Sequence, residues 1–329
     1  GFDIWGVAET LERAVGMFAF ALWDRADRVL VLGRDRFGEK PLYWGWQGQG
    51  AARTLLFGSE LKAFHDHPSF EKRIDQKAAA AFFQRLAVPG AKLAAGTIMR
   101  FSQGSETPEI TTYWSLHAAI EHGATNRFTG SDAEMLDATE ALMSSIVQRQ
   151  MISDVPLGAF LSGGIDSSLV TALMQRHSDR PVKTFSIGFA EKEFDESGYS
   201  EDVARHLGTD HTVLQLTPED TMGVIPYISD IYDEPFADIS QIPTFIVSKL
   251  ARESVTVCLS GDGADEMFGG YTRYARALQA WDIRNRLPSA AWRGLAPLAR
   301  GLAAATRSMD GPGGRLERGA RAAGIFDSA

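Results

Sequence analysis

Apolar and polar positions follow two different patterns along this chain, and the pattern changes near residue 131. In the first third, short apolar runs rich in aromatic and β-branched residues are separated by polar turns. The runs at 17–24 and 28–35, joined by the polar stretch 24–27, are typical of a β-hairpin. Further strands are expected at 41–46, 54–59, 96–102 and 110–116, with a helix at 75–86 that has Asp75 as its N-cap. The pattern predicts an antiparallel module.

The second pattern, from residue 132 onward, alternates strands with helices. Strands are expected at 157–162, 182–189, 211–216 and 255–260, and helices at 132–150, 166–177, 200–208, 219–231, 241–253 and from Tyr271. Because the strands are short and almost continuously apolar, the alternation predicts a doubly wound parallel sheet. Between the two modules, residues 117–131 lose periodicity and are expected to form a linker. The tail after Leu287 carries an apolar stripe at helical spacing, which is typical of core packing.

Composition narrows the function classes. The chain has 329 residues, 44% of them hydrophobic and 23% charged, which excludes wholesale disorder. A net charge of −9 makes nucleic acid an improbable partner, and no stretch approaches the ~18 apolar residues of a membrane span. A single cysteine, Cys258, excludes an intramolecular disulfide framework and a thiolate zinc site, and points to a reducing, cytoplasmic location.

The sharpest chemical signal is LSGGIDSS, residues 161–168, where the first strand of the second module gives way to a helix. Gly163 and Gly164 allow a tight turn and close approach to an anion, and the new helix presents free N–H groups there. Its serines, Ser162, Ser167 and Ser168, add hydroxyl donors. Asp166 would repel a bare anion, so its presence fits a Mg²⁺ ion between carboxylate and phosphate. The simpler alternative is a strand-to-helix turn with a polar N-cap.

A second loop, LSGDGADEMFGGY at 259–271, repeats a similar arrangement after the last strand. Alone, it fits a mere acidic turn, and it lacks the spacing of a calcium-binding loop. Two such loops at the carboxyl ends of parallel strands are expected to converge on one ligand. Asp166 and Asp265 would then share the Mg²⁺ of a triphosphate, with Asp262 facing the reacting group. Neither loop has the Walker or dinucleotide-binding pattern.

Other polar residues rank lower as functional candidates. His206 and His211 flank Gly208 and are more typical of cap and surface positions than of ligands. Cys258 lies in the apolar run VTVCL and is interpreted as a buried small hydrophobe.

Taken together, these motifs resemble the glutamine-dependent asparagine synthetase family over nearly the whole chain. The resemblance rests on segments that occur in a fixed order: GMFAFALWD, RDRFGEKPLYWG, FGSELKAF, DVPLGAFLSGGIDSSLV, FSIGF, DEPFADISQIPT and SGDGADEMFGGYTRY. The combination is far more specific than any one segment.

The resemblance implies two half-enzymes and an α/β plus α+β fold class. Residues 1–116 would be the C-terminal part of a glutaminase (class II glutamine amidotransferase) domain with the N-terminal-nucleophile layer. Residues 132–329 would be the synthetase domain, a doubly wound ATP-pyrophosphatase (PP-loop, adenine nucleotide alpha hydrolase-like) domain, incomplete at its C-terminus. In the family, the glutaminase releases ammonia from glutamine. The synthetase forms aspartyl-adenylate and pyrophosphate from aspartate and ATP, and ammonia then gives asparagine and AMP.

Carried over position by position, the resemblance assigns residues to ATP, metal and catalysis. Those expected to bind ATP are Leu161, Ser162, Gly163, Gly164, Asp166, Ser167, Ser168, Ile187, Ser260 and Gly261. Leu161 and Ile187 would hold the adenine or ribose. The catalytic candidates are Asp262, at a position that is acidic and often Glu in the family, and Asp265, which matches a Mg²⁺-linked aspartate. Asp166 and Asp265 are the expected metal ligands.

Both ends of the chain depart from the family pattern. The sequence begins inside the glutaminase domain, past the terminal cysteine nucleophile, and the internal Cys258 cannot replace it. It stops before the helices that carry a further synthetase lysine. We therefore expect a fragment of a longer gene product or an incomplete gene model, without glutamine hydrolysis of its own.

Two other functions stay open at this point. The first is an amidotransferase of the same family that acts on another carboxylate, such as a sugar acid, a peptide or a β-lactam precursor. The second is a non-catalytic scaffold, against which the completeness of both ATP loops argues. The expected partners are ATP with Mg²⁺, aspartate, and glutamine or ammonia, without nucleic acid or membrane, and a homodimer is left open.

Overall fold

A computed structural model describes residues 1–50, 53–85, 88, 92–189, 195, 197–235 and 237–286. The chain divides into two compact units, and each is described here by itself. The first comprises Gly1–Gly164 with Val170–Leu259, and the second comprises Ile165–Leu169 with Ser260–Ala329. The predicted apolar tail after Leu287 lies outside the described residues.

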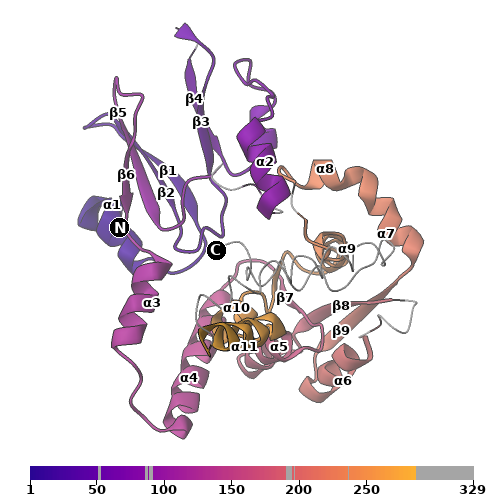
Figure 1. The fold of residues 1–329 in the computed structure, drawn as a ribbon. Helices are drawn as coiled ribbons and strands as arrows, with labels where there is room; N and C mark the ends of the chain where they lie inside the picture. The colour runs from indigo at the N-terminus through magenta and orange to yellow at the C-terminus, as the bar shows by residue number, and fades with distance from the viewer. Residues whose placement is uncertain are drawn as a thin grey trace. The chain divides into compact units, whose positions relative to one another are not determined.

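The first unit opens with antiparallel strands, as the alternating pattern predicts (Figure 1). One sheet has the order β1-β2-β5-β6 and a second pairs β3 with β4. These strands are β1 (Ala19–Asp24), β2 (Val29–Arg34), β3 (Tyr43–Gln47), β4 (Thr54–Gly58), β5 (Thr97–Ser102) and β6 (Glu109–Thr112). The predicted hairpin is confirmed, because Asp24 pairs with Val29 and its Oδ1 accepts the N–H groups of Ala26 and Asp27 at 2.8 and 3.1 Å.

Four short helices accompany these strands: α1 (Phe2–Arg13), the 3-10 turn η2 (Leu61–Phe64), α2 (Gln76–Arg85) and α3 (Leu116–Thr125). The predicted N-cap at Asp75 is confirmed, since its Oδ1 accepts the N–H of Ala78 at 2.9 Å. The segment 117–131, expected to form a linker because it loses periodicity, is helical over most of its length. There α3 begins after Ser115, whose hydroxyl caps the N–H of Ala118, and all of its residues lie outside the core.

The alternation predicted after residue 131 is present. In order, the elements are α4 (Asp132–Gln150), β7 (Leu157–Phe160), α5 (Ile165–Arg176), β8 (Lys183–Phe189), α6 (Ser197–Leu207), β9 (Asp210–Leu216), α7 (Pro218–Val224), η3 (Ile225–Tyr227), α8 (Ile228–Ile231), α9 (Gln241–Arg252), β10 (Val257–Leu259), α10 (Ala264–Phe268) and α11 (Thr272–Arg286). The single helix expected at 219–231 is broken, because Pro226 cannot donate the backbone hydrogen bond that a continuous helix needs.

The sheet formed after residue 131 is parallel throughout and has the order β10-β7-β8-β9. The chain moves outward from β7 through β8 to β9 and then returns to place β10 on the other side of β7. This reversal places the carboxyl ends of β7 and β10 side by side, at the position where open α/β sheets generally bind their ligands. Those two ends carry the Gly-rich loops.

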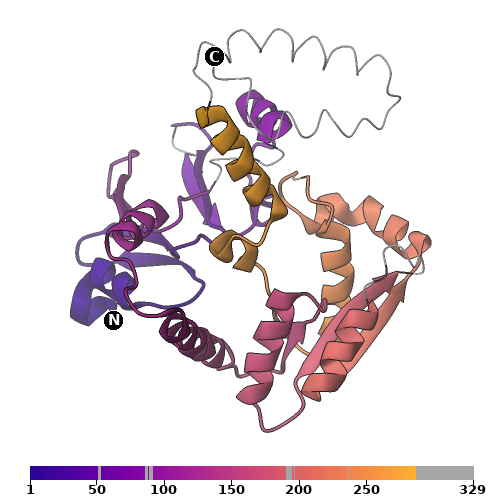
Figure 2. The ribbon, with the colours of Figure 1, turned by 60° about the horizontal axis from the view of Figure 1, so that its bottom comes forward.

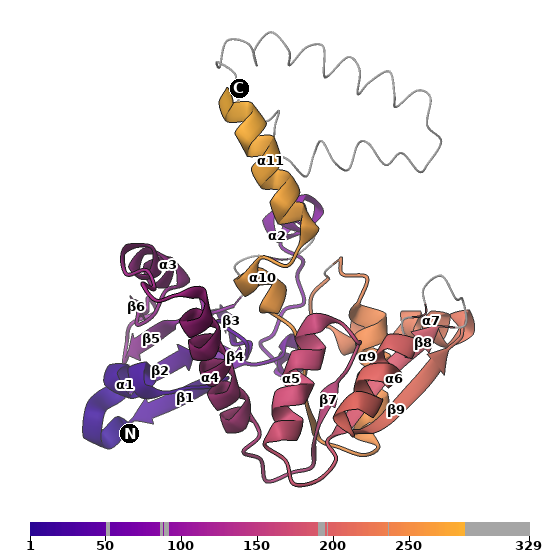
Figure 3. The same cartoon turned by 90° about the horizontal axis from the view of Figure 1, so that it is seen from below.

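Helices cover both faces of the parallel sheet, so successive strand residues pack on opposite sides. On one face Ala159 joins Leu173 and Met174 of α5 in a core cluster. On the other, Phe185 packs against Ala251 and the chain just after α9. Figures 2 and 3 show α6 along the first face, and Figure 3 shows α9 behind the second. None of the described helices combines the length and apolar character needed to cross a bilayer.

The buried Phe185 offers a direct test of this packing. It is 2% exposed, so F185A should lower the free energy of unfolding by about 3–5 kcal/mol through lost burial and the cavity left behind. The matched control is F83A, because Phe83 is 80% exposed and should change stability by less than about 0.5 kcal/mol. Urea unfolding followed by circular dichroism measures both, and equal effects would contradict the assigned core.

Candidate functional site

The loop after β7 approaches α6 so closely that only glycine fits at its centre. Leu161, 1% exposed, donates its N–H to the carbonyl of Phe185 at 2.9 Å and so extends the strand pairing. Gly163 then adopts φ +80°, and a Cβ there would lie 2.7 Å from both the backbone nitrogen of Ser200 and the Cβ of Tyr199. The left-handed turn and the contact with α6 therefore both require Gly163.

The first turn of α5 presents donors without a side-chain cap. Gly164 is the N-cap residue and supplies no capping side chain, while Ser162 Oγ accepts the N–H of Gly164 at 3.3 Å. Ser167 is 8% exposed. The hydroxyl of Ser168 is buried and has no hydrogen-bond partner among the described residues, which costs about 1–3 kcal/mol unless a ligand satisfies it. An anion at this helix end would meet the positive end of the helix dipole.

The loop after β10 meets the start of α5 within the second unit. A Cβ on Gly261 would lie 2.7 Å from the backbone nitrogen of Ser167 and 2.9 Å from the carbonyl carbon of Asp166. The two Gly-containing loops are thus in backbone contact, as the sequence predicts. Gly261 is required there because any side chain would force them apart.

The acidic residues of the second loop are held by local contacts. Ser260 donates its hydroxyl to Asp262 Oδ2 at 2.9 Å, and the Asp262 side chain is exposed. Asp265 lies in the first turn of α10, and its Oδ1 occupies the space that a Cβ on Gly270 would fill, at 1.9 Å. Both carboxylates therefore have defined positions without a salt bridge among the described residues.

An aromatic and ionic cluster closes this loop. The Tyr271 hydroxyl donates to Glu266 Oε1 at 2.7 Å, which lowers the pKa of Glu266 and raises that of Tyr271. The Arg273 guanidinium lies 3.9 Å from the centre of the Tyr271 ring, a cation–π contact. These contacts fix the turn at 269–271 that leaves room for Asp265.

A metal ion would need ligands beyond the protein. Within the described residues, no three His, Cys, Asp or Glu side chains gather closely enough to hold an ion. Mg²⁺ keeps near-octahedral oxygen coordination and is commonly bound by one or two carboxylates plus substrate phosphates and water. The predicted pair Asp166 and Asp265, together with the orphaned Ser168 hydroxyl, fits such a metal-polyphosphate group and does not fit a metal bound by protein alone.

The predicted nucleotide contacts on the first unit are apolar. Leu161 is almost fully buried, and Ile187 packs in a cluster with Leu216, Val224 and Ile246. Their assignment to adenine or ribose stays a prediction. Cys258 packs beside Phe185 and Val255, and burial raises the pKa of its thiol to about 11, in agreement with its interpretation as a small hydrophobe.

A buried polar network beneath Gly163 was not predicted. His211, interpreted from sequence as a cap or surface residue, is instead half-buried in β9, and its Nδ1 and Nε2 contact the hydroxyls of Thr184 and Ser186 at 2.9 and 3.2 Å. Ser186 in turn accepts the hydroxyl of Ser200 at 3.0 Å. Since Ser200 is the residue against which Gly163 packs, the network supports α6 beneath the loop. The alternation within FSIGF, which places Ser186 on the face opposite Phe185, is the signal that could have revealed it.

The chain matches known proteins over both modules. Residues 138–322 match the asparagine synthase family model, and residues 1–136 match that of the glutamine amidotransferase domain. A putative asparagine synthetase [glutamine-hydrolyzing] of Mycobacterium tuberculosis is 36% identical over 84% of this chain and 43% of its own length. Asparagine synthetase [glutamine-hydrolyzing] 1 of Bacillus subtilis is 34% identical over 85% of this chain and 43% of its own. This chain spans about half the length of the curated relatives it matches.

The close approach at Gly163 can be tested against a matched glycine. Gly163 and Gly208 both have left-handed φ angles, +80° and +73°, so a Cβ costs about 1–2 kcal/mol at each. Nothing lies within 4 Å of a Cβ on Gly208, whereas at Gly163 overpacking adds about 1–3 kcal/mol. G163A should therefore lower the unfolding free energy more than G208A. Equal loss in the two variants would refute the contact with α6.

The buried imidazole predicts a pH dependence of stability. Burial lowers the pKa of His211, an effect that the nearby Glu201 carboxylate only partly offsets, so the folded protein binds the proton less tightly than the unfolded chain. The contribution of His211 to stability is complete above its ordinary pKa, about 6.5, and is lost as pH falls through the lower folded value.

Wild-type protein should therefore lose more stability than H211N between about pH 7 and pH 5 in urea unfolding. The exposed His206 provides the control: H206N should follow the wild type. Parallel pH profiles for wild type and H211N would contradict the buried, neutral imidazole.

Proposed function

This chain belongs to the asparagine synthase family, and on that premise we propose that it activates a carboxylate with ATP for amidation. The proposed acceptor is aspartate, the intermediate is aspartyl-adenylate, and the product is asparagine. In the full-length enzyme the ammonia would come from glutamine. The family of its relatives, whose names include asparagine synthetase [glutamine-hydrolyzing], supports the aspartate assignment.

The observation that carries the proposal is the backbone contact between the two Gly-containing loops. Gly261, from the loop after β10, packs against Asp166 and Ser167 at the start of α5. A mononucleotide phosphate chain needs many N–H donors at short range and space free of side chains. The adjacent ends of β7 and β10 place both loops at the start of α5, and the buried Ser168 hydroxyl, which has no hydrogen-bond partner among the described residues, adds a donor.

In the proposed reaction, an acceptor carboxylate oxygen attacks the α-phosphorus of ATP and pyrophosphate leaves. Ammonia then attacks the acyl carbon, and AMP leaves with the bonding electron pair. The loop Ser162–Ser168 would bind the departing pyrophosphate through its N–H and hydroxyl groups. Asp166 and Asp265 would hold Mg²⁺, which supplies charge neutralisation when bound. Catalysis of this kind consists of positioning and electrostatic stabilisation, without a covalent enzyme intermediate.

Ser260, Gly261 and Asp262 would lie beside the adenylate, where Asp262 has the exposure that contact with a reacting group requires. Leu161 and Ile187 would border the base or ribose.

The first module would be part of a glutaminase domain with the N-terminal-nucleophile layer, and the parallel sheet a PP-loop type domain. The antiparallel sheets β1-β2-β5-β6 and β3-β4 and the match to a glutamine amidotransferase domain support the first assignment. The strand order and the two loops support the second. A cytoplasmic location and the absence of nucleic acid and membrane partners remain expectations from composition, and a homodimer stays open.

The decisive measurement is pyrophosphate release from Mg-ATP by the purified chain, with ammonium present and aspartate compared with other carboxylic acids. Aspartate should give the highest kcat/KM. D166N should lower that rate by about 10²-fold or more, because a carboxylate beside the metal and phosphates is replaced by a neutral amide. The control is D202N: Asp202 is exposed and pairs only locally with Arg205, so its rate should stay unchanged.

A higher kcat/KM for a different carboxylate would replace aspartate as the acceptor. Near-normal release by D166N would remove the metal role of Asp166. Failure of the folded chain to bind Mg-ATP would favour the scaffold function.

A further inference from the structure

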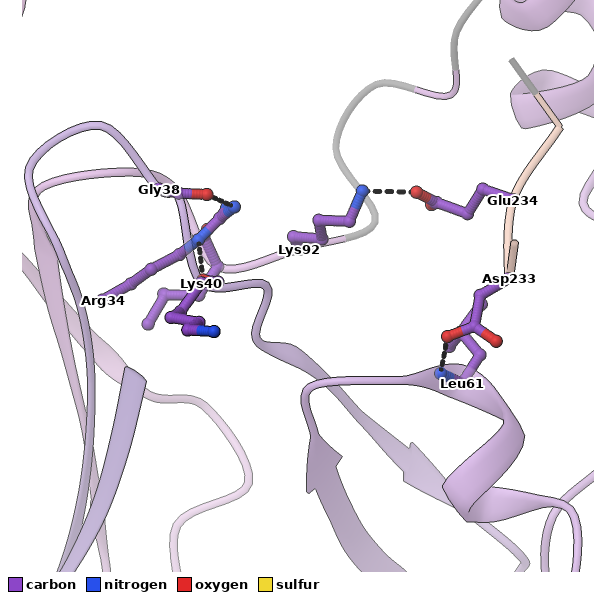
Figure 4. A network of polar contacts seen from close by, with 8 residues as sticks. Arg34, Gly38, Lys40, Leu61, Lys92, Asp233 and Glu234 are labelled. Carbon is purple, nitrogen blue, oxygen red and sulfur yellow. Dashed lines mark hydrogen bonds and ion pairs between the residues drawn. The ribbon is translucent and has the colours of Figure 1, made fainter. Parts of the chain in front are cut away.

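Two adjacent carboxylates in the first unit find their partners in the antiparallel module. Asp233 and Glu234 follow α8, and their side chains are only 11% and 14% exposed. The cations that pair with them among the described residues are Lys62 and Lys92, from the first hundred residues of the chain. Figure 4 shows both carboxylates turned toward that module.

Asp233 is bound at the 3-10 turn η2. Its Oδ2 accepts the backbone N–H of Leu61 at 2.6 Å, and its Oδ1 lies 3.6 Å from Lys62 Nζ. Lys62 also donates to the carbonyls of Asp230 and Ile231 at 3.0 and 3.3 Å. These carbonyls end α8, where a cation interacts favourably with the helix dipole. One lysine thus holds both the end of α8 and the residue that follows it.

Glu234 is bound by Lys92, whose Nζ donates to Glu234 Oε2. The ammonium also lies 5.1 Å from the centre of the Tyr43 ring, and Tyr43 is 4% exposed. Burial, reinforced by the Glu234 carboxylate, raises the pKa of Tyr43. The ion pair is therefore set in an environment where water screens it weakly.

The backbone around Lys92 is itself held in place. Residue 92 bridges to Tyr43, and the N–H of Leu93 donates to the carbonyl of Leu42 at 2.8 Å. The guanidinium of Arg34 donates to the carbonyl of Leu93 at 2.7 Å and to that of Lys40 at 2.8 Å. The backbone of Lys92 is therefore held in place, and its ion pair with Glu234 fixes the position of the Glu234 side chain as well as neutralising its charge.

The acidic pair leads directly to the ligand-binding edge of the parallel sheet. Only residues 253–256 separate α9 from β10, so α9 runs back along the sheet and its first residues lie at the carboxyl edge of the strands. Among the described residues, 235 and 237–240 lie between the acidic pair and that end of α9. Asp238 Oδ1 accepts the N–H and hydroxyl of Ser240 at 2.8 and 2.7 Å, and Tyr232 donates to the carbonyl of Gln241 at 3.0 Å. The residue that precedes the acidic pair is thus hydrogen-bonded directly to the start of α9.

We infer that Lys62 and Lys92 are positioning residues that hold the acidic pair and the preceding Tyr232, which is hydrogen-bonded to the start of α9 at the carboxyl edge of the sheet, so that the antiparallel module determines how well the acceptor carboxylate binds there. The inference rests on the proposed function, in which the Gly-containing loops take the phosphates of ATP. The second substrate would then bind beside the start of α9, at the same edge. Neither lysine contacts a reacting group.

The test compares K92M with K92R in pyrophosphate release from Mg-ATP with aspartate and ammonium. K92M leaves a largely buried carboxylate without its cation, which should raise KM for the acceptor about tenfold while kcat and KM for ATP change less than about twofold. K92R keeps the charge and should restore most of the affinity. R176M is the matched control, because Arg176 pairs with Glu140 while both side chains are largely exposed, at 60% and 58%.

An unchanged KM for the acceptor in K92M, or an equal loss in kcat and in KM for ATP, would overturn the inference. Hydrogen exchange supplies a readout that does not depend on activity. K92M should speed amide exchange in peptides covering 233–250, whereas R176M should not. If wild-type protein releases no pyrophosphate with any carboxylate, the proposed function fails. The exchange result then decides the positioning role: slow exchange at 233–250 in K92M refutes it, and faster exchange there supports it.

Discussion

The pairing of β10 beside β7, with Leu259 opposite Ala159, is the constraint on which the candidate site depends. The chain forms β8 and β9 on one side of β7 before it returns to the other, so two loops far apart in sequence start from adjacent strands. Neither loop can then have a side chain at the residue where its backbone contacts the adjacent helix. Gly163 contacts α6 and Gly261 contacts the start of α5, and in both places the nearest atoms include backbone atoms of the neighbouring helix. The glycines thus follow from the topology as much as from the ligand.

Local patterns were sufficient to predict the strands, the hairpin and most helices, because burial repeats with the period of each element. The cap at Asp75 and the loops at 161–168 and 259–271 are local as well. The failures have equally physical causes. Pro226 divides a helix that periodicity alone would continue, and the Ser115 cap starts α3 in a segment without an apolar stripe.

Contacts between residues that are far apart in the sequence could not be predicted from the sequence. Lys92 and Glu234 are 142 positions apart, and neither stands out as more than a surface charge when its neighbours in sequence are considered. His211 was misjudged for the same reason, since its burial is set by hydroxyls of β8 on the adjacent strand. The pattern of apolar and polar residues indicates which positions are buried. It does not indicate which polar group a residue contacts on an adjacent strand or in another module.

The two faces of the parallel sheet differ in how their buried side chains are stabilised. Phe185 and Ile187 point toward α9 and α7 in purely apolar clusters. Thr184 and Ser186, on the opposite face, are buried but joined to His211 and Ser200 through hydroxyl and imidazole contacts. A fully connected polar network keeps a single arrangement, because each broken contact leaves a buried group unsatisfied. The network therefore gives the loop at Gly163 rigid support from beneath.

The acidic pair at 233–234 follows a different logic. Removing two carboxylates from water is costly, and well-packed apolar side chains of similar size would often stabilise a fold equally well. Net stability therefore does not explain why Asp233 and Glu234 are largely buried against lysines. Their partners do: a buried charge accepts only a partner of opposite sign at the right place, so the pairs select one register of the acidic segment against η2 and the Lys92 strand bridge. The desolvation of these carboxylates is unfavourable, but their ion pairs fix the position of the chain that leads into α9. A substrate at the carboxyl edge would meet the start of α9.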